Sequence, residues 1–181
     1  LGNKLDSIDY SNKTFKVVIE DLNNSTFFIL ETKKIINAAG LNAHKILNKF
    51  KPDTTFIPNL LKGDYYSYTG KEKLSHLIYP LPTDSSLGVH ATIDLGKGIR
   101  FGPSAYQVSD IDYSISETHK EFFLSSVRRY WPSIKKDELV PSYSGIRPLL
   151  INYDDFVLDK IDIDESFMVS ILGYASPGLT S

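Results

Sequence analysis

The sequence predicts an α+β fold built on a large, mainly antiparallel sheet with a few helices packed against it. Short runs with alternating apolar and polar residues recur along the chain, and turn residues separate them. Only two stretches have clear helical spacing. With 41% hydrophobic and 23% charged residues, the 181-residue chain has the composition of a globular protein and the length for one core or two small ones.

The first 42 residues predict a small antiparallel β-meander followed by one more buried strand. Asn-rich turns between β-branched and aromatic runs are typical of hairpins. The expected strands are 14–20, 26–31 and 34–38. Residues 43–50 then predict a short helix that ends before Pro52.

The middle of the chain predicts further strands. They are expected at 63–68, 74–81, 87–95 and 99–101. In the third of these, the alternation should turn four residues to the core: Val89, Ala91, Ile93 and Leu95. His90 lies on the opposite face. The segment Gly96-Lys97-Gly98 lacks a third glycine and a following helix, so it predicts a hairpin turn rather than a phosphate loop.

One longer helix is expected in the second half of the chain. Ser116 should cap it, and Pro132 marks its end. Its buried stripe is expected to consist of Phe123, Val127, Tyr130 and Trp131. Strands are then predicted at 139–150, 155–158 and 167–172.

The composition argues against several classes of function. The formal net charge is -2 and the basic residues are scattered, which indicates neither nucleic acid nor an anionic membrane as a partner. The absence of cysteine excludes disulfides, thiolate zinc sites and thiol nucleophiles, and it suits a reducing compartment. No apolar run is long enough for a transmembrane segment. We expect a cytoplasmic protein, with peripheral binding at the inner membrane as the alternative.

The four histidines have no spacing typical of metal ligands, so no metal site is expected. His44 and His119 fall on predicted helix surfaces, where solvated side chains are the simplest interpretation. His90 shares its strand face with Thr92 and Asp94, and tyrosines from neighbouring strands could line the same face. For His90, a ligand-facing position and a plain surface position both stay open.

Tyr143, Gly145 and Arg147 share one face of a predicted strand. The glycine leaves room between an aromatic hydroxyl and a guanidinium, an arrangement that suits a carboxylate, because the planar guanidinium fork matches its two oxygens. The alternative is that Arg147 only forms a salt bridge at the surface.

Two glycine-containing segments suggest close backbone approach to a ligand. Ala38-Ala39-Gly40 follows a buried strand, and the turn 176–181 would present backbone amides at a helix start. Because this turn follows the strand 167–172 and nothing follows the turn, we expect the chain to be a piece of a longer protein.

Taken together and in order, eight segments resemble the D-amino-acid oxidase and glycine oxidase superfamily of FAD-dependent oxidoreductases, especially its L-2-hydroxyglutarate dehydrogenase/oxidase branch. The segments are IINAAGL (35–41), KGDY (62–65), SHLIYP (75–80), LGVHATID (87–94), RFGP (100–103), RYWP (129–132), YSGIRP (143–148) and SPGLT (176–180). One position departs from that branch, since Ala175 stands where a glutamate is common.

The resemblance implies a two-domain flavoprotein. Residues 1–42 would end the FAD-binding domain, 43–165 would form the substrate-binding domain, and 166–181 would return to the flavin. FAD is the cofactor expected for the full-length protein. The chain lacks the Gly-x-Gly-x-x-Gly segment that holds the FAD pyrophosphate, so we expect that it does not retain FAD by itself.

The resemblance also assigns expected roles to individual residues. Arg147 would bind the substrate carboxylate, with Tyr65 and Tyr143 in the same pocket, and His90 would be the catalytic base. The residues expected near FAD are Ala38, Ala39, Gly40, Gly173, Ser176, Pro177, Gly178, Leu179 and Thr180.

The implied reaction is hydride transfer from the α-carbon of a small, L-2-hydroxyglutarate-like 2-hydroxy acid to the flavin, with oxygen or a quinone as the final electron acceptor. A glycine or amino-acid oxidase is one alternative. A catalytically inactive folded fragment of such an enzyme is the other.

Overall fold

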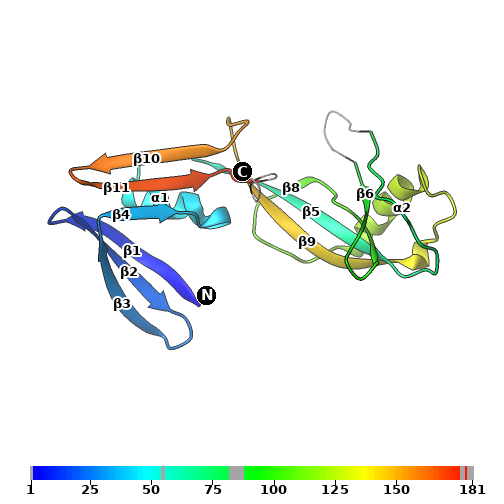
Figure 1. The fold of residues 1–181 in the computed structure, drawn as a ribbon, viewed down its shortest axis with the longest axis horizontal. Helices are drawn as coiled ribbons and strands as arrows, with labels where there is room; N and C mark the ends of the chain where they lie inside the picture. The colour runs from blue at the N-terminus through cyan, green and yellow to red at the C-terminus, as the bar shows by residue number, and fades with distance from the viewer. Residues whose placement is uncertain (1, 54–55, 82–87, 176–177, 179–181) are drawn as a thin grey trace. The chain divides into compact units, whose positions relative to one another are not determined.

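The computed structural model describes residues 2–53, 56–81, 88–175 and 178, and it divides the chain into two compact units (Figure 1). Unit 1 comprises Leu1–Asn59 and Pro148–Ser181, and unit 2 comprises Leu60–Arg147. These units are defined by internal contacts, whereas the domains expected from the sequence were defined by role. The domain boundaries at 42 and 165 therefore stay a prediction.

Unit 1 begins with the expected meander. Its strands are β1 (Asn3–Ser11), β2 (Thr14–Asp21) and β3 (Thr26–Thr32), joined in antiparallel order β1-β2-β3. The sequence predicted β2 and β3 but not β1. In β1 the register shifts between Leu5 and Ser7, so the inward-facing residues Leu5 and Ile8 lose the spacing of two that marks a strand.

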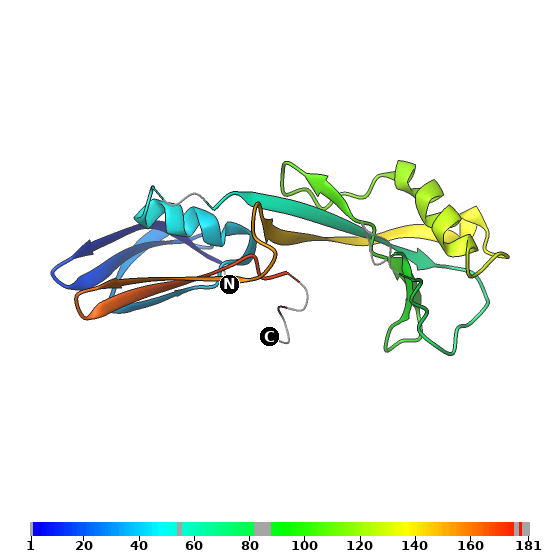
Figure 2. The ribbon, with the colours of Figure 1, turned by 90° about the horizontal axis from the view of Figure 1, so that it is seen from above.

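The second sheet of unit 1 joins distant parts of the sequence. It has the order β10 (Val157–Ile163), β11 (Ser166–Leu172), β4 (Lys34–Asn37), with β11 antiparallel to β10 and parallel to β4. The strand expected at 155–158 begins later and runs further than predicted. Figure 2 shows the meander and this sheet together with helix α1 (Ala43–Phe50), which follows the 3-10 turn η1 (Gly40–Asn42).

Helix α1 is as predicted, and it packs within the core of unit 1. Its Ala43 and Leu47 are buried against residues of both sheets, among them Phe15 of β2 and Met168 of β11. Burial of these apolar side chains is the main force that holds the two sheets of the unit together.

Unit 2 is built on a five-stranded sheet. Its strands are β6 (His90–Ile93), β7 (Ile99–Gly102), β5 (Pro58–Tyr68), β8 (Tyr106–Val108) and β9 (Leu139–Leu150), the last of which pairs with β5. Residue 87, the start of one predicted strand, lies outside the described residues. The hairpin turn predicted at 96–98 is confirmed, since the Asp94 amide donates to the Gly98 carbonyl at 2.9 Å. Leu95 is fully exposed in that turn, so its expected core position was wrong.

The strand predicted at 74–81 is absent from the described residues. Ile78 alone forms an antiparallel bridge, to Ala91, while Leu77, Tyr79 and Leu81 are exposed. Pro80 carries no backbone N–H and interrupts any longer ladder.

One face of the unit 2 sheet is covered by helix α2 (Lys120–Arg128). The Ser116 hydroxyl accepts a hydrogen bond from the Thr118 amide, as predicted for a cap, but the first turn is the 3-10 helix η2 (Glu117–His119). A further 3-10 turn, η3 (Lys136–Glu138), precedes β9. The core contains Phe123, Leu124 and Val127 of α2 against Tyr66, Ala91 and Phe101 of the sheet.

Within the described ranges, no helix has the length and apolar character needed to cross a membrane. The same ranges contain no cluster of three His, Cys, Asp or Glu side chains placed to hold a metal ion.

Candidate functional site

The face of the unit 2 sheet opposite α2 carries three residues in a row. Residues opposite each other in an antiparallel pair share a face. His90 is opposite Gly102, and the pairing of Tyr66 with Phe101 places Tyr65 beside Gly102. We call the side that carries His90, Gly102 and Tyr65 the open sheet face, because the intervening residues belong to the core under α2.

Gly102 makes room on the open sheet face for the ring of Tyr65. A Cβ added at Gly102 would stand 2.5 Å from Cδ1 of Tyr65 and 2.9 Å from the Asp64 carbonyl oxygen. Real Cβ atoms do not approach other heavy atoms so closely, so a larger residue would displace either the ring or the strand. The position of Tyr65 is therefore set by backbone as well as by side-chain packing.

Tyr65 lies in a stack that reaches across three strands. Its ring is stacked on that of Tyr143 in β9, with centroids 4.5 Å apart and an interplanar angle of 12°. The guanidinium of Arg100 lies 5.6 Å from the centroid of the Tyr143 ring, and Asp94 holds Arg100 through an ion pair of 3.0 Å. Cation and ring at this separation attract each other.

Arg147 acts electrostatically on the same tyrosine. Burial raises the pKa of Tyr65, the neighbouring Tyr143 adds to the rise, and the positive charge of Arg147 partly opposes it. Gly145, between Tyr143 and Arg147 in sequence, would meet no described heavy atom within 4 Å if it carried a Cβ. The structure thus brings together the two tyrosines and the arginine predicted for substrate binding, with open space beside them. That chemistry suits a carboxylate or another small anion.

His90 is connected to this group through Tyr79. The two rings lie 4.4 Å apart, and Tyr79 also acts on the Tyr65 hydroxyl by raising its pKa. His90 therefore belongs to the open sheet face, as the alternation predicted, while its role as catalytic base stays a prediction.

Two features of unit 2 were missed from the sequence. Arg100 lies on the open sheet face opposite Thr92, a position that strand alternation could have indicated. His119 was expected to be solvated; 34% of its side chain is exposed, but the imidazole also has a buried partner. Its Nδ1 lies 2.8 Å from Oδ2 of Asp64, a residue with no exposed surface. This contact joins positions 55 residues apart, so no local pattern could predict it.

In unit 1, two of the glycines predicted to lie near FAD, Gly40 and Gly173, are at one edge of the second sheet. Because β4 and β11 are parallel, Gly40 and Gly173 follow the carboxyl ends of neighbouring strands. Both have positive φ angles, 55° and 70°, which glycine adopts readily. They also line one small cavity together with His44, Leu41 and Leu172.

Buried hydrogen bonds fix the backbone that leads to Gly40. The side-chain amide of Asn37, at the end of β4, donates to the Ala43 carbonyl at 2.8 Å and to the Ser170 hydroxyl at 3.1 Å. These bonds join the start of α1 and strand β11 to the residue that precedes Ala38 and Ala39. The Ala38-Ala39-Gly40 segment is thus held at both ends.

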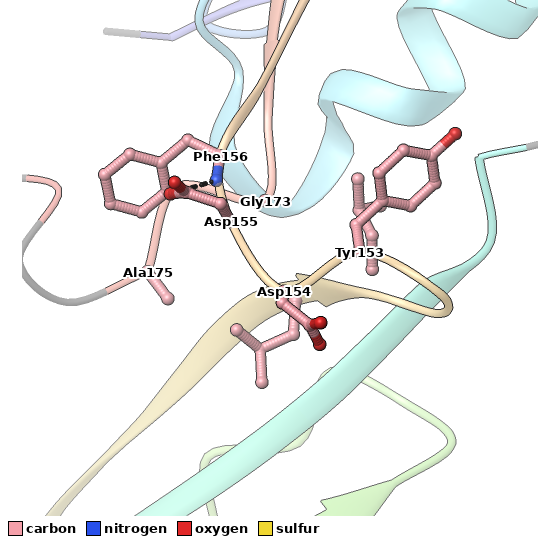
Figure 3. Close-up of a pocket in the computed structure, with 8 residues that line it drawn as sticks. Tyr153, Asp154, Asp155, Phe156, Gly173 and Ala175 are labelled. Atoms are coloured by element: carbon pink, nitrogen blue, oxygen red, sulfur yellow. Dashed lines mark hydrogen bonds between the residues drawn. The ribbon is translucent and has the colours of Figure 1, made fainter.

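A second cavity, of about 330 Å³, lies beside Gly173 (Figure 3). Phe156 and Tyr153 stand on opposite sides of the hollow, and the dashed line marks the bond from the Phe156 amide to the Asp155 carboxylate, 2.7 Å long. Its lining residues are Leu149, Leu150, Tyr153, Asp154, Asp155, Phe156, Gly173 and Ala175.

The segment after Gly173 is described only in part. Tyr174 stacks on Phe156 with centroids 4.1 Å apart, and the Gly178 amide donates to the Ala175 carbonyl. Four residues predicted to contact FAD lie outside the described residues: Ser176, Pro177, Leu179 and Thr180.

The edge of the second sheet is compatible with a dinucleotide cofactor. Such ligands bind outside the carboxyl ends of parallel strands, where glycines let backbone come close. If Gly40 carried a Cβ, it would meet no heavy atom of the described residues within 4 Å, apart from its chain neighbours. Gly40 therefore leaves open space beside its backbone where FAD was expected, whereas a Cβ at Gly173 would lie 3.6 Å from the Leu150 side chain.

Comparison with known families settles the class of protein. The model of the family described as FAD dependent oxidoreductase (DAO) matches residues 2–181. The chain belongs to this family. Its mixed fold of several, mostly antiparallel sheets with few helices is the fold of FAD oxidoreductases of the DAO type.

Relatives of this chain include proteins with two different activities. The mitochondrial L-2-hydroxyglutarate dehydrogenase of Arabidopsis thaliana is 31% identical over 167 residues, which cover 81% of this chain and 35% of the relative. The glycerol 3-phosphate dehydrogenase of Caloramator mitchellensis is 26% identical over 187 residues, covering 100% of this chain and 36% of the relative.

Among solved structures of the family, the reduced L-alpha-glycerophosphate oxidase of Mycoplasma pneumoniae with FAD bound superimposes with a TM-score of 0.82 at 25% identity. The match covers 98% of this chain and 46% of that protein. The chain thus spans about a third to a half of the length of the relatives that it matches.

Proposed function

We propose that this chain supplies the substrate-binding sheet and part of the flavin site of an FAD-dependent enzyme that oxidises a small 2-hydroxy acid at its α-carbon. The observation that carries the proposal is the stacking of Tyr65 on Tyr143 on the open sheet face. Strand alternation in β9 puts Arg147 on the same face as Tyr143, and its charge acts on Tyr65. Membership in the FAD dependent oxidoreductase family supports the reaction class. The L-2-hydroxyglutarate dehydrogenase among the relatives supports the substrate class.

In this proposal, Arg147 binds the substrate carboxylate through two parallel N–H···O bonds, and Tyr65 and Tyr143 orient it. His90 accepts the proton of the substrate hydroxyl, since an imidazole is suited to proton transfer near neutral pH. Bound FAD supplies the acceptor for the α-carbon hydride. Ala38, Ala39, Gly40, Gly173 and the 176–180 segment would hold the cofactor, and oxygen or a quinone would take up the electrons.

A substrate panel tests this assignment. A protein extended to the length of its relatives should oxidise L-2-hydroxyglutarate. Its rates of ammonia release from glycine and of glycerol 3-phosphate oxidation should both be much lower. Arg147→Lys should raise KM for the hydroxy acid at least about tenfold, because lysine cannot form the bidentate pair. Arg129→Lys, at an exposed position beyond α2, is the matched control. An unchanged KM in Arg147→Lys would contradict the proposal that Arg147 binds the substrate carboxylate.

Glycerol 3-phosphate is the second candidate substrate. Arg100 places another guanidinium on the open sheet face through its contact with Tyr143, and two cations suit a phosphate. Faster turnover of glycerol 3-phosphate than of the hydroxy acid would favour this candidate, whereas ammonia release from glycine would favour an amine oxidase.

An inactive folded fragment is the remaining alternative for the 181-residue chain itself. Its absorption spectrum after purification and incubation with FAD is the decisive measurement. We expect no flavin band after gel filtration, because the chain lacks the pyrophosphate-binding glycine segment. A retained yellow colour would contradict that expectation.

A further inference from the structure

Behind the open sheet face, unit 2 contains a buried carboxylate. Asp64 of β5 has no exposed surface, and its side chain points to the face opposite that of Tyr65. Its Oδ2 accepts a hydrogen bond from the Tyr106 hydroxyl at 2.8 Å and lies 2.8 Å from Nδ1 of His119. Its Oδ1 is buried with no hydrogen-bond partner among the described residues.

Packing alone is a poor explanation for such a group. An unpartnered buried carboxylate oxygen costs free energy, and an apolar residue of similar volume is often as stable or more so. The contacts of Asp64 do something that apolar packing does not: their fixed directions join three elements. Tyr106 comes from β8 and His119 from η2, and both converge on one oxygen of β5.

The nearby buried lysine, Lys62, has other partners than Asp64. The ammonium of Lys62, also buried on β5, contacts the Ser114 carbonyl and lies 3.9 Å from Asp112 Oδ2. Lys62 is therefore directed to the loop before η2 and not to Asp64. The Tyr66 hydroxyl donates to the Ser116 carbonyl in the same region, at 3.1 Å.

The backbone of Asp64 is fixed to the corner between β7 and β8. Its amide donates to the Ser104 hydroxyl at 2.8 Å, and its carbonyl accepts from the Ser104 amide at 3.1 Å. Two residues before Ser104 lies Gly102, against which the ring of Tyr65 rests with no space for a Cβ. A shift of β5 by a few tenths of an ångström relative to this corner would therefore move the ring of Tyr65.

We propose that Asp64, held by Tyr106 and His119, is a positioning residue that sets where Tyr65 stacks on Tyr143 on the open sheet face. The effect of Asp64 on substrate binding rests on the proposed function, whereas its effect on the position of the Tyr65 ring does not. Asp64 acts through β5 and needs no contact with substrate.

The test compares three variants of the 181-residue chain by NMR with labelled tyrosine rings. Asp64→Asn keeps the volume and removes the charge, and Tyr106→Phe removes a single oxygen atom that donates to Asp64. Asp112→Asn is the matched control, because it removes a carboxylate of the same unit that is exposed and not bonded to Asp64. The readout is the cross-relaxation between the rings of Tyr65 and Tyr143, which are 4.5 Å apart.

We expect the cross-peak between the rings to weaken at least about twofold in Asp64→Asn and in Tyr106→Phe, and to stay unchanged in Asp112→Asn. If Asp64→Asn does not fold, Tyr106→Phe decides alone, because it leaves the ring packing of Tyr106 intact. A cross-peak of normal intensity in Tyr106→Phe, or an equal loss in Asp112→Asn, overturns the proposal.

Kinetics of the extended protein separate this proposal from the proposed function. With a 2-hydroxy acid as substrate, Asp64→Asn should raise KM at least about tenfold and lower kcat less, since a misplaced Tyr65 weakens orientation of the bound acid. A lost ring contact together with no activity of the unsubstituted protein on the acid would refute the proposed function and leave the positioning role standing. An unchanged ring contact refutes the positioning role whatever the substrate.

Discussion

The ring of Tyr65 lies directly on the backbone of Gly102, which is itself the cross-strand partner of His90. The position of the Tyr65 ring on the open sheet face thus depends on a residue without a side chain. Gly102 also has a φ of 152°, outside the range that side chains favour.

Gly102→Ala should therefore destabilise unit 2 by about 3 kcal/mol, from overpacking against Tyr65 and from backbone strain. Urea unfolding followed by the fluorescence of Trp131, the single tryptophan, measures this. Gly145→Ala is the control, since its Cβ would meet no described heavy atom within 4 Å, and it should change stability by less than about 0.5 kcal/mol. Equal effects of the two substitutions would contradict the packing argument.

Asn37→Ala should destabilise unit 1 by about 1 to 3 kcal/mol. The substitution removes the donor to the Ala43 carbonyl and to the Ser170 hydroxyl, and leaves both buried acceptors to find other partners. Thermal unfolding followed by circular dichroism is the measurement. Asn24→Ala, in the exposed turn between β2 and β3, removes only a surface hydrogen bond and should have an effect below about 0.5 kcal/mol.

Stability should fall at alkaline pH, in part because of Tyr130. Burial raises the pKa of this tyrosine above its ordinary value of 10.0, and its hydroxyl donates to the Val89 carbonyl at 3.0 Å. A raised pKa means that the folded state holds the proton more tightly than the unfolded state. The contribution is therefore complete below pH 10 and declines as the pH rises from there towards the folded pKa.

Tyr130→Phe should lower stability by about 1 kcal/mol at neutral pH and make the alkaline decline shallower, because no phenol titrates at that position. Urea unfolding at several values between about pH 8 and pH 11 gives the slope. Tyr113→Phe is the control, because Tyr113 is 53% exposed. A slope unaffected by Tyr130→Phe would argue against this assignment.

Local signals explain what the sequence could predict. The bounds of α1 and β9 agree with the expected ranges, because helical spacing before Pro52 and a long strand-like run need no distant partner. Beyond local signals, the prediction failed for physical reasons. The bulge in β1 removed the alternation by which a strand is predicted. Pro80 interrupted an otherwise strand-like run. Leu95 is an apolar residue, but it lies in a turn and is exposed.

The candidate site shows the same division. Alternation placed His90 on the correct face of the sheet. The spacing of Tyr143, Gly145 and Arg147 predicted one shared strand face, and the binding of an anion there stays a prediction. The stacking of Tyr65 on Tyr143 and the pairing of Asp64 with His119 join residues far apart in sequence. Only the completed sheet brings such residues together, so their contacts could not be derived from local spacing.

Substitutions of Gly40 test whether this residue is needed for its backbone conformation or for contact with FAD. Gly40 has a φ of 55° and open space where a side chain would stand. Gly40→Ala should cost about 1 kcal/mol of stability, and Gly40→Asn less, because asparagine tolerates this left-handed conformation better.

If FAD approaches this backbone in the extended protein, FAD affinity should follow the opposite order. Asparagine is larger than alanine, so Gly40→Asn should weaken FAD binding more, by at least about tenfold, although it is the more stable variant. Flavin fluorescence titration of the apoproteins gives the affinities, and thermal unfolding gives the stabilities. FAD affinities that rank as the stabilities do would show that Gly40 serves the fold of η1 and not the cofactor, because a steric contact with a ligand depends on side-chain size rather than on backbone preference.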